Sequence, residues 1–133
     1  MADKILRALV VDDSPMMRVM EEKALTAIGI PDIMQAADGA EALSLLDRGR
    51  YDLMILDLVM PEMDGVEVAR KIRESSGINK NIPILMVTGD TSAKTARQIA
   101  NLRVNGFVTK PFTLRDLEEK ISAVLNTGQV SKT

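Results

Sequence analysis

The sequence predicts an α/β protein with a doubly wound, five-stranded parallel sheet. Apolar segments of strand length alternate five times with amphipathic segments of helix length, a pattern typical of repeated βα units. The apolar segments are continuous rather than alternating, as expected for strands that are covered on both faces. Five such units in 133 residues are too few for a closed eight-stranded barrel. We therefore expect an open sheet, with ligands bound beyond the carboxyl ends of its strands.

Each predicted strand is an apolar run that is followed by a helix. The strands are expected at 8–11, 33–36, 53–56, 84–87 and 106–109. The first helix begins at Ser14-Pro15, because serine caps helix N-termini well and proline is best tolerated in the first turn. An apolar stripe follows, and Gly29 ends the helix. The stripe consists of Met17, Met20, Ala24 and Ile28.

The other four helices differ in how clearly the sequence defines them. They are expected near 40–47, 66–74, 92–102 and 113–126. The inward positions of the second and third helices are Leu43, Leu46, Val68 and Ile72. The fourth helix is rich in alanine and threonine and has a weak apolar stripe, which predicts a lightly anchored helix. The fifth is the clearest, because Thr113 can cap it and five aliphatic residues keep helical spacing. These residues are Leu114, Leu117, Ile121, Val124 and Leu125.

One domain is expected over residues 1–126, followed by a short polar tail at 127–133. The N-terminal segment is too short and too polar for a signal peptide or a membrane span. These features predict a cytoplasmic protein without membrane insertion.

The composition excludes several classes of function. The chain carries 17 Lys+Arg and 19 Asp+Glu, a net charge of −2, and has no basic tract, so direct nucleic-acid binding is not expected. It contains no cysteine and no histidine. Disulfides, thiolate or Ser-His catalysis, a histidine-zinc site and a phosphohistidine are therefore excluded. Any phosphohistidine must belong to a partner protein.

Acidic residues end two of the predicted strands. Asp12 and Asp13 follow the first strand, Asp57 follows the third, and Lys110 follows the fifth. Parallel strands place all these ends on one edge of the sheet. Three carboxylates about 4 Å apart repel one another by about 4 kcal/mol per pair at an effective dielectric constant near 20. A divalent cation and a lysine would relieve this repulsion, and together they form a site suited to phosphoryl transfer.

The inference depends on the combination of these residues, because each motif alone has an ordinary explanation. Acidic residues before a helix are usually caps, and Pro61 with Asp64-Gly65 marks a tight turn before the third helix. Thr88 lies at the end of the fourth strand, and a threonine at this place is, by itself, typical of an ordinary turn. The turn does not explain why a buried strand should end on the carboxylate of Asp57.

The whole pattern resembles a response-regulator receiver domain of the CheY type, from about Lys4 to Leu125. The resemblance implies the flavodoxin-like strand order 2-1-3-4-5 and a stand-alone response regulator of two-component signalling. The motifs that carry it are Val10-Val11-Asp12-Asp13, Asp57 with Met60-Pro61 and Asp64-Gly65, Met86-Val87-Thr88, and Gly106-Phe107-Val108-Thr109-Lys110-Pro111-Phe112.

This resemblance implies that Asp57 accepts a phosphoryl group from the phosphohistidine of a sensor histidine kinase. It also implies a Mg²⁺ ion held by Asp13, Asp57 and the backbone carbonyl of Val59, with Asp12 bound to the ion through water. Carboxylate, carbonyl and water oxygens are the ligands that suit this ion. The implied activity is self-catalysed phosphorylation and dephosphorylation of the aspartate, not enzymatic turnover of an external substrate.

The same resemblance implies how a signal leaves the site. Thr88 and Lys110 would contact the phosphoryl oxygens, and the Lys110-Pro111 bond would be cis, an isomer that X-Pro bonds permit. Thr88 would be coupled to Phe107, and the readout face would be the fourth helix, fifth strand and fifth helix. The chain departs from the family on that face. Phe107 stands where chemotaxis members commonly have tyrosine, and Leu102-Arg103-Val104 replaces smaller residues.

Chemotaxis is the favoured setting, because Lys110-Pro111-Phe112-Thr113 and Leu117-Glu118-Glu119-Lys120 resemble that subgroup. The implied partners are a sensor histidine kinase, a phosphatase and a downstream protein target, the flagellar motor switch in the chemotaxis case. A single-domain phosphorelay intermediate or another signalling receiver is the alternative.

Two other classes fit less well. A haloacid-dehalogenase-like phosphatase also uses a strand-end aspartate, Mg²⁺ and lysine, but it requires a second aspartate two residues after the first, where this chain has Val59. A flavodoxin-like electron carrier needs a hydroxyl-rich phosphate loop and aromatic residues around the flavin. The chain lacks that loop after its first strand, and its aromatic residues are Tyr51, Phe107 and Phe112.

Overall fold

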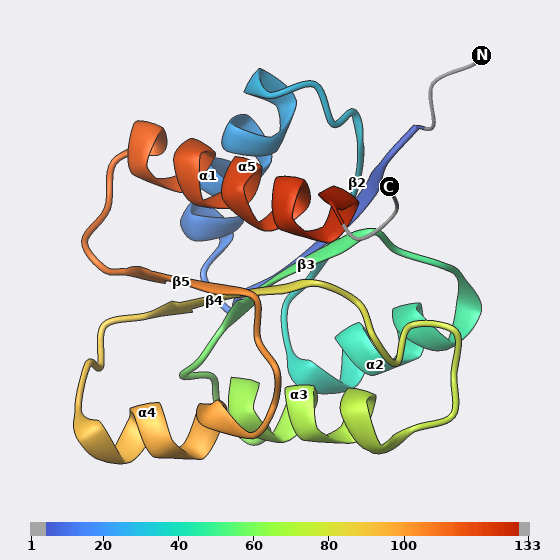
Figure 1. Ribbon diagram of the computed structural model, residues 1–133, viewed down its shortest axis with the longest axis vertical. Helices are drawn as coiled ribbons and strands as arrows, with labels where there is room; N and C mark the ends of the chain where they lie inside the picture. Colours follow the sequence, from blue (N-terminus) through green and yellow to red (C-terminus); the bar gives the residue numbers. More distant parts are fainter. Residues whose placement is uncertain (1–4, 131–133) are drawn as a thin grey trace.

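In the computed structural model, which describes residues 5–130, a five-stranded parallel sheet lies between two layers of helices (Figure 1). The strands are β1 (Arg7–Val11), β2 (Asp32–Ala36), β3 (Leu53–Asp57), β4 (Ile84–Thr88) and β5 (Gly106–Thr109). The helices are α1 (Pro15–Ala27), α2 (Gly39–Arg48), α3 (Gly65–Glu74), α4 (Ala93–Ala100) and α5 (Leu114–Val130). The spatial order of the strands is β2-β1-β3-β4-β5, so the predicted fold class and strand order are confirmed.

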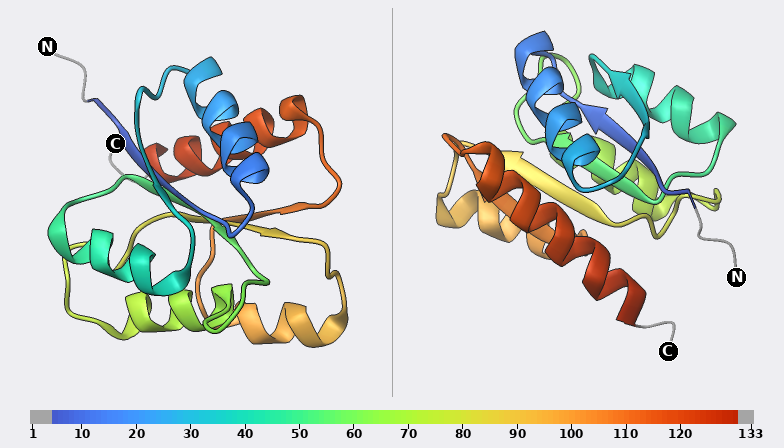
Figure 2. Two further views of the ribbon diagram at one scale, coloured as in Figure 1. Left: turned by 180° about the vertical axis from the view of Figure 1, so that it is seen from behind. Right: turned by 90° about the horizontal axis from the view of Figure 1, so that it is seen from above.

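The helices are divided between the two faces of the sheet (Figures 1 and 2). Helices α1 and α5 pack side by side on one face, and α2, α3 and α4 cover the other. Alternate residues of a strand point to opposite faces. Ala8 and Val10 of β1 therefore join the apolar cluster beneath α1 and α5, whereas Leu9 and Val11 join the cluster on the opposite face. This double coverage is why the central strands are continuous apolar segments.

The two edge strands are less buried than the sequence predicted. Strands β3 and β4 are buried along their whole length, and β1 is buried from Ala8 onwards. In β2 the fully buried residue is Ala36, and in β5 it is Val108. An edge strand has a neighbour on one side only, and the helix layers cover it incompletely. The expected coverage on both faces is therefore confirmed for the three central strands and was wrong for β2 and β5.

The helix ends follow the capping signals in the sequence. The hydroxyl of Ser14 accepts a hydrogen bond from the N–H of Met17 (3.3 Å) at the start of α1. Thr113 and Asp116 bond reciprocally at the start of α5, at 3.0 Å in each direction. Gly29, with a φ of +94°, follows the end of α1 in the left-handed region that glycine adopts at low cost.

Helices α4 and α5 differ in how firmly they are packed. In α4 the buried residues are Thr95 and Ile99, so the prediction of a lightly anchored helix is confirmed. Helix α5 buries Leu117, Ile121 and Val124, whereas Leu114, the first of the five aliphatic residues with helical spacing, is exposed.

Helix α5 also continues to Val130, so residues 127–130 of the predicted tail are helical. The rest of that tail, residues 131–133, lies outside the described residues. Within residues 5–130, no helix has the length and apolar character needed to cross a membrane.

Candidate functional site

The strand register brings the predicted acidic residues together. Val11 of β1 lies opposite Leu56 of β3, so Asp12 and Asp57 follow at equivalent positions on neighbouring strands. The chain order reverses here, because β2 lies on the far side of β1. Carboxylate oxygens of Asp12, Asp13 and Asp57 lie within 4.8 Å of one another. Asp12 and Asp57 are buried and Asp13 is exposed, so the cluster reaches solvent through Asp13.

Asp57 is a buried carboxylate with a lysine beside it. The Nζ of Lys110 lies 3.4 Å from Oδ1 of Asp57, and the N–H of Val59 donates to the same oxygen at 3.4 Å. Burial raises the pKa of Asp57 to about 6, and the neighbouring Asp12 adds to the rise, whereas Lys110 and the Val59 N–H oppose it. Asp57 is therefore largely ionised at neutral pH, although burial destabilises its charged form.

Asp12 is anchored through one oxygen and left open at the other. Its Oδ1 accepts a hydrogen bond from the N–H of Ser14 (2.9 Å), and its backbone carbonyl accepts one from Arg18 (2.6 Å). Its Oδ2 is buried, lies 4.0 Å from Nζ of Lys110 and has no hydrogen-bond partner among residues 5–130. Burial raises the pKa of Asp12, and the bond from Ser14 is the largest opposing influence.

The residues fit a divalent cation of the Mg²⁺ type. Three carboxylates meet here, and the lysine beside them neutralises one of the three charges. The buried Oδ2 of Asp12 needs a partner, because an unpaired buried polar atom costs about 1–3 kcal/mol. Oxygen donors of this kind suit Mg²⁺.

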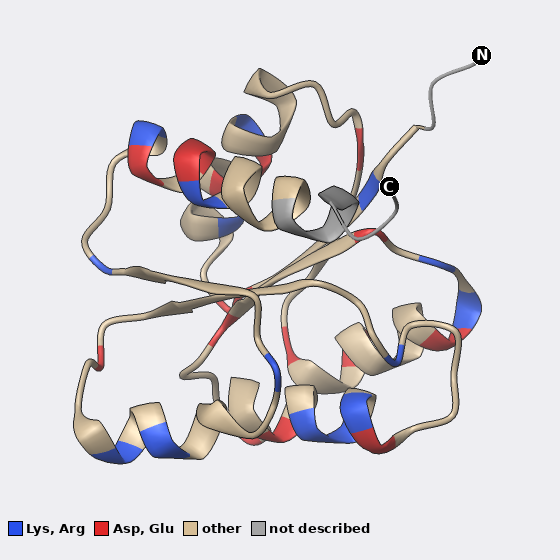
Figure 3. Ribbon diagram, viewed as in Figure 1, with Lys and Arg blue, Asp and Glu red and all other residues tan. Residues whose placement is uncertain are grey.

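Charges on the strands otherwise lie at strand ends, and on the helices acidic and basic residues are interspersed (Figure 3).

The loop after β3 holds the end of that strand in place. The N–H of Gly65 donates to the carbonyl of Leu58 (2.8 Å), and a Cβ at Gly65 would overlap the carbonyl oxygen of Asp57. Asp64 caps α3 by accepting a bond from the N–H of Glu67 (2.9 Å). The predicted turn is confirmed, and its glycine is needed because α3 starts directly against the backbone of β3.

Lys110 and Thr88 come from the ends of β5 and β4. The N–H of Lys110 donates to the carbonyl of Thr88 (2.8 Å), and the Lys110-Pro111 bond is cis, as expected. The hydroxyl of Thr88 is buried and engaged with the loop that follows. It accepts from the N–H of Asp90 (2.8 Å) and lies 3.2 Å from the Asp90 carbonyl, to which it can donate.

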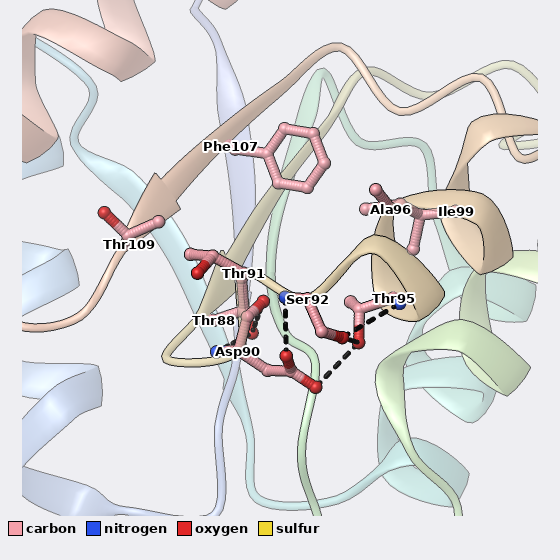
Figure 4. Close-up of a pocket in the computed structure, with 9 residues that line it drawn as sticks. All are labelled: Thr88, Asp90, Thr91, Ser92, Thr95, Ala96, Ile99, Phe107 and Thr109. Carbon is pink, nitrogen blue, oxygen red and sulfur yellow. Dashed lines mark hydrogen bonds between the residues drawn. The ribbon is translucent and has the colours of Figure 1, made fainter.

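Beyond Thr88, a cavity of about 290 Å³ separates the start of α4 from β5 (Figure 4). Phe107, a residue that is 39% exposed, lines it from β5. The opposite wall is a hydrogen-bonded group, in which Asp90 accepts from the hydroxyl of Thr95 (2.7 Å) and from the N–H of Ser92 (2.9 Å). Thr88 and Phe107, which the sequence singled out, therefore line one cavity.

Sequence reasoning missed one buried acidic residue near the site. Glu21 of α1 is fully buried, and neither of its carboxylate oxygens has a hydrogen-bond partner in the described part of the chain. A signal was present, since Glu21 lies four residues after Met17 and three before Ala24, within the predicted apolar stripe. Burial, with smaller contributions from Asp12 and Asp57, raises the pKa of Glu21 to about 9.

Comparisons with known proteins agree with this geometry. The profile of the response regulator receiver domain matches residues 8–122. The chemotaxis protein CheY-3 of Vibrio cholerae is 33% identical over 122 residues, which cover 92% of this chain and 93% of that protein. The chemotaxis protein CheY of Pseudomonas aeruginosa is 35% identical over 119 residues, or 90% of this chain and 95% of that protein.

Solved structures show the same likeness. Chemotaxis protein CheY4 of Vibrio cholerae is 34% identical and matches with a TM-score of 0.84, covering 92% of this chain and 100% of that one. A CheY-like receiver domain protein of Methanospirillum hungatei is 26% identical, with a TM-score of 0.86 and coverage of 96% and 99%.

Proposed function

The chain belongs to the response regulator receiver domain family, and on this basis we propose that it is a stand-alone phospho-acceptor switch. In this proposal Asp57 takes a phosphoryl group from the phosphohistidine of a sensor histidine kinase. The observation that carries the proposal is the surroundings of Asp57, a buried strand-end carboxylate with two further acids and a lysine around it.

Asp57 is suited to act as the nucleophile, because a carboxyl with a pKa of about 6 is mostly ionised at neutral pH. One of its oxygens forms a bond to phosphorus while the bond from phosphorus to the histidine nitrogen breaks. The leaving nitrogen keeps the electron pair, and the imidazole leaves neutral when its other nitrogen already carries a proton. The product on this chain is an acyl phosphate at Asp57.

The remaining residues provide charge and position, which a loose phosphoryl-transfer transition state needs more than covalent help. Asp13, Asp57 and the carbonyl of Val59 would hold Mg²⁺ directly, and Asp12 would hold it through water. When bound, the ion supplies positive charge to the phosphoryl oxygens. Lys110, 3.4 Å from Asp57, supplies a second positive charge from the carboxyl end of β5.

The proposed switch uses the cavity beside Thr88. When the hydroxyl of Thr88 turns to a phosphoryl oxygen, it must give up its bonds to the backbone of Asp90. The carboxylate of Asp90 in turn holds Ser92 and Thr95 at the start of α4. The cavity of about 290 Å³ then offers room for the ring of Phe107, a residue that is 39% exposed in this state. A change in α4 and β5 would alter the face that the family uses for output.

We place this switch in chemotaxis, because three of the relatives described above are chemotaxis proteins. The partners are then a sensor histidine kinase, a phosphatase and the flagellar motor switch, and the proposed location of this protein is the cytoplasm. Phosphorylation and dephosphorylation are self-catalysed events on Asp57, and no external substrate is turned over. A role as a phosphorelay intermediate instead predicts onward transfer from Asp57 to a second histidine.

Incubation with acetyl phosphate and Mg²⁺ tests the proposal directly. Intact-mass spectrometry should show one added phosphoryl group on the wild-type protein, and none when the metal is chelated or in Asp57→Ala. Asp47→Ala, an exposed helical position, is the matched control and should behave as wild type. Phosphorylation of Asp57→Ala at the wild-type rate would place the acceptor elsewhere.

A further inference from the structure

Glu21 is the buried acid that the proposed chemistry does not use. Helix α1 begins three residues after Asp12, so its first turns lie nearest the carboxyl ends of the strands. Glu21 occupies the second turn and is fully buried with the core residues Ala24 and Leu25 of the same helix. A leucine or methionine at this helical spacing would satisfy the fold.

The surroundings of Glu21 connect it to the acidic cluster. The charged groups that act on it are Asp12 at the end of β1, Asp57 at the end of β3, Lys110 after β5, and Arg18 one turn earlier on α1. Four buried side-chain atoms within residues 5–130 lack a hydrogen-bond partner, and three of them are Oδ2 of Asp12 and the two carboxylate oxygens of Glu21. Unpaired buried polar atoms are rare and costly, so three of them on two carboxyl groups that interact electrostatically point to a ligand.

Glu21 does not belong to the set that could coordinate an ion directly. The carboxylate oxygens that lie within 4.8 Å of one another are those of Asp12, Asp13 and Asp57. Glu21 is fully buried on α1, and the two acids that act on it, Asp12 and Asp57, are the buried members of that set. Glu21 is therefore suited to orient the ligands without touching the metal, a role that commonly controls metal affinity.

We propose that Glu21 is an outer-sphere carboxyl of the divalent cation site and strengthens Mg²⁺ binding through Asp12 and Asp57. Glu21 is thus a positioning residue, because it acts through the carboxylates that hold the ion. The inference rests on the proposed function, since it requires that the acidic cluster bind Mg²⁺. It also explains why the fold retains a buried acid that costs stability, a feature typical of functional sites.

Titration calorimetry with MgCl₂ at pH 7.5 tests the inference on wild type, Glu21→Gln, Glu21→Leu and a matched control, Glu22→Gln. Glu22 is the neighbouring acid on α1, and its carboxylate is bonded to Gln35 at 3.4 Å. Glu21→Leu should bind Mg²⁺ about tenfold more weakly than wild type, the size of effect typical of groups behind metal ligands. Glu21→Gln, whose amide replaces a carboxyl that is protonated at this pH, should bind close to wild type. Glu22→Gln should bind as wild type.

Denaturant melts in EDTA separate the proposed role from a structural one. Both Glu21 variants should unfold at a higher denaturant concentration than wild type, so that weaker Mg²⁺ binding cannot come from a damaged fold. Unchanged Mg²⁺ affinity in Glu21→Leu would overturn the inference and leave the proposed function standing. If wild type itself binds no Mg²⁺, the magnesium site is wrong and the inference fails with it.

Discussion

Replacing Glu21 by glutamine should change how the stability of the protein depends on pH. In the folded state the pKa of Glu21 is raised from 4.5 to about 9, because the side chain is fully buried and has no hydrogen-bond partner within residues 5–130. In the unfolded chain the same carboxyl ionises near its ordinary value. Between these two values the folded protein holds a proton that the unfolded chain has lost.

The sign and size of the effect follow from proton linkage. Below about pH 4.5, Glu21 is protonated in both the folded and the unfolded state, so it contributes no pH dependence to the stability. Above that pH the unfolded state binds fewer protons, so stability falls as pH rises, by about 1.4 kcal/mol per pH unit. Between pH 5.5 and 7.5, wild type should lose about 3 kcal/mol relative to Glu21→Gln.

Urea melts followed by circular dichroism, in EDTA and at half-unit steps of pH, measure this difference. Asp12 and Asp57 also titrate with raised pKa values, but both are present in both proteins, so the difference curve isolates Glu21. Glu22→Gln, at a partly exposed position of the same helix, is the control and should follow wild type. Parallel curves for wild type and Glu21→Gln would refute the reasoning, because they would show that Glu21 ionises equally in both states.

Three further predictions concern the phosphorylation site. Asp13→Asn should raise the stability of the metal-free protein by about 1 kcal/mol and weaken Mg²⁺ binding. Denaturant melts with and without Mg²⁺ measure both effects. A variant that is destabilised and still binds Mg²⁺ normally would show that Asp13 is a structural cap. Lys110→Ala should keep Mg²⁺ binding and abolish the change in partner affinity on adding beryllofluoride, a phosphoryl mimic; an undiminished change would remove Lys110 from the mechanism. Phe107→Ala should cost less than the roughly 3–5 kcal/mol of a fully buried phenylalanine and should blunt the same affinity change, as should Thr88→Ala. A loss of stability as large as that of a fully buried phenylalanine, with unchanged partner affinities, would show that Phe107 only packs in the core.

Much of the site could be predicted because the sequence marks its own strand ends. A continuous apolar run that stops at a charge fixes both the length of the strand and the place where the charge lies. Once the strands are parallel, Asp12, Asp57 and Lys110 must meet at one edge of the sheet. Cap residues such as Ser14 and Thr113 mark helix starts in the same local way, and the structure confirms both.

Other features depend on residues that are distant in sequence, and only the tertiary structure decided them. The composition of β5 resembles that of a covered strand, yet its edge position leaves Phe107 exposed beside a cavity. Helical spacing places Glu21 in an apolar stripe, but the charges that act on it come from β1, β3 and the end of β5. Local sequence therefore determined which groups end the strands, because propensity and capping act within a few residues. Burial and electrostatic coupling were decided by packing, because they sum the contributions of elements that meet only in the folded chain.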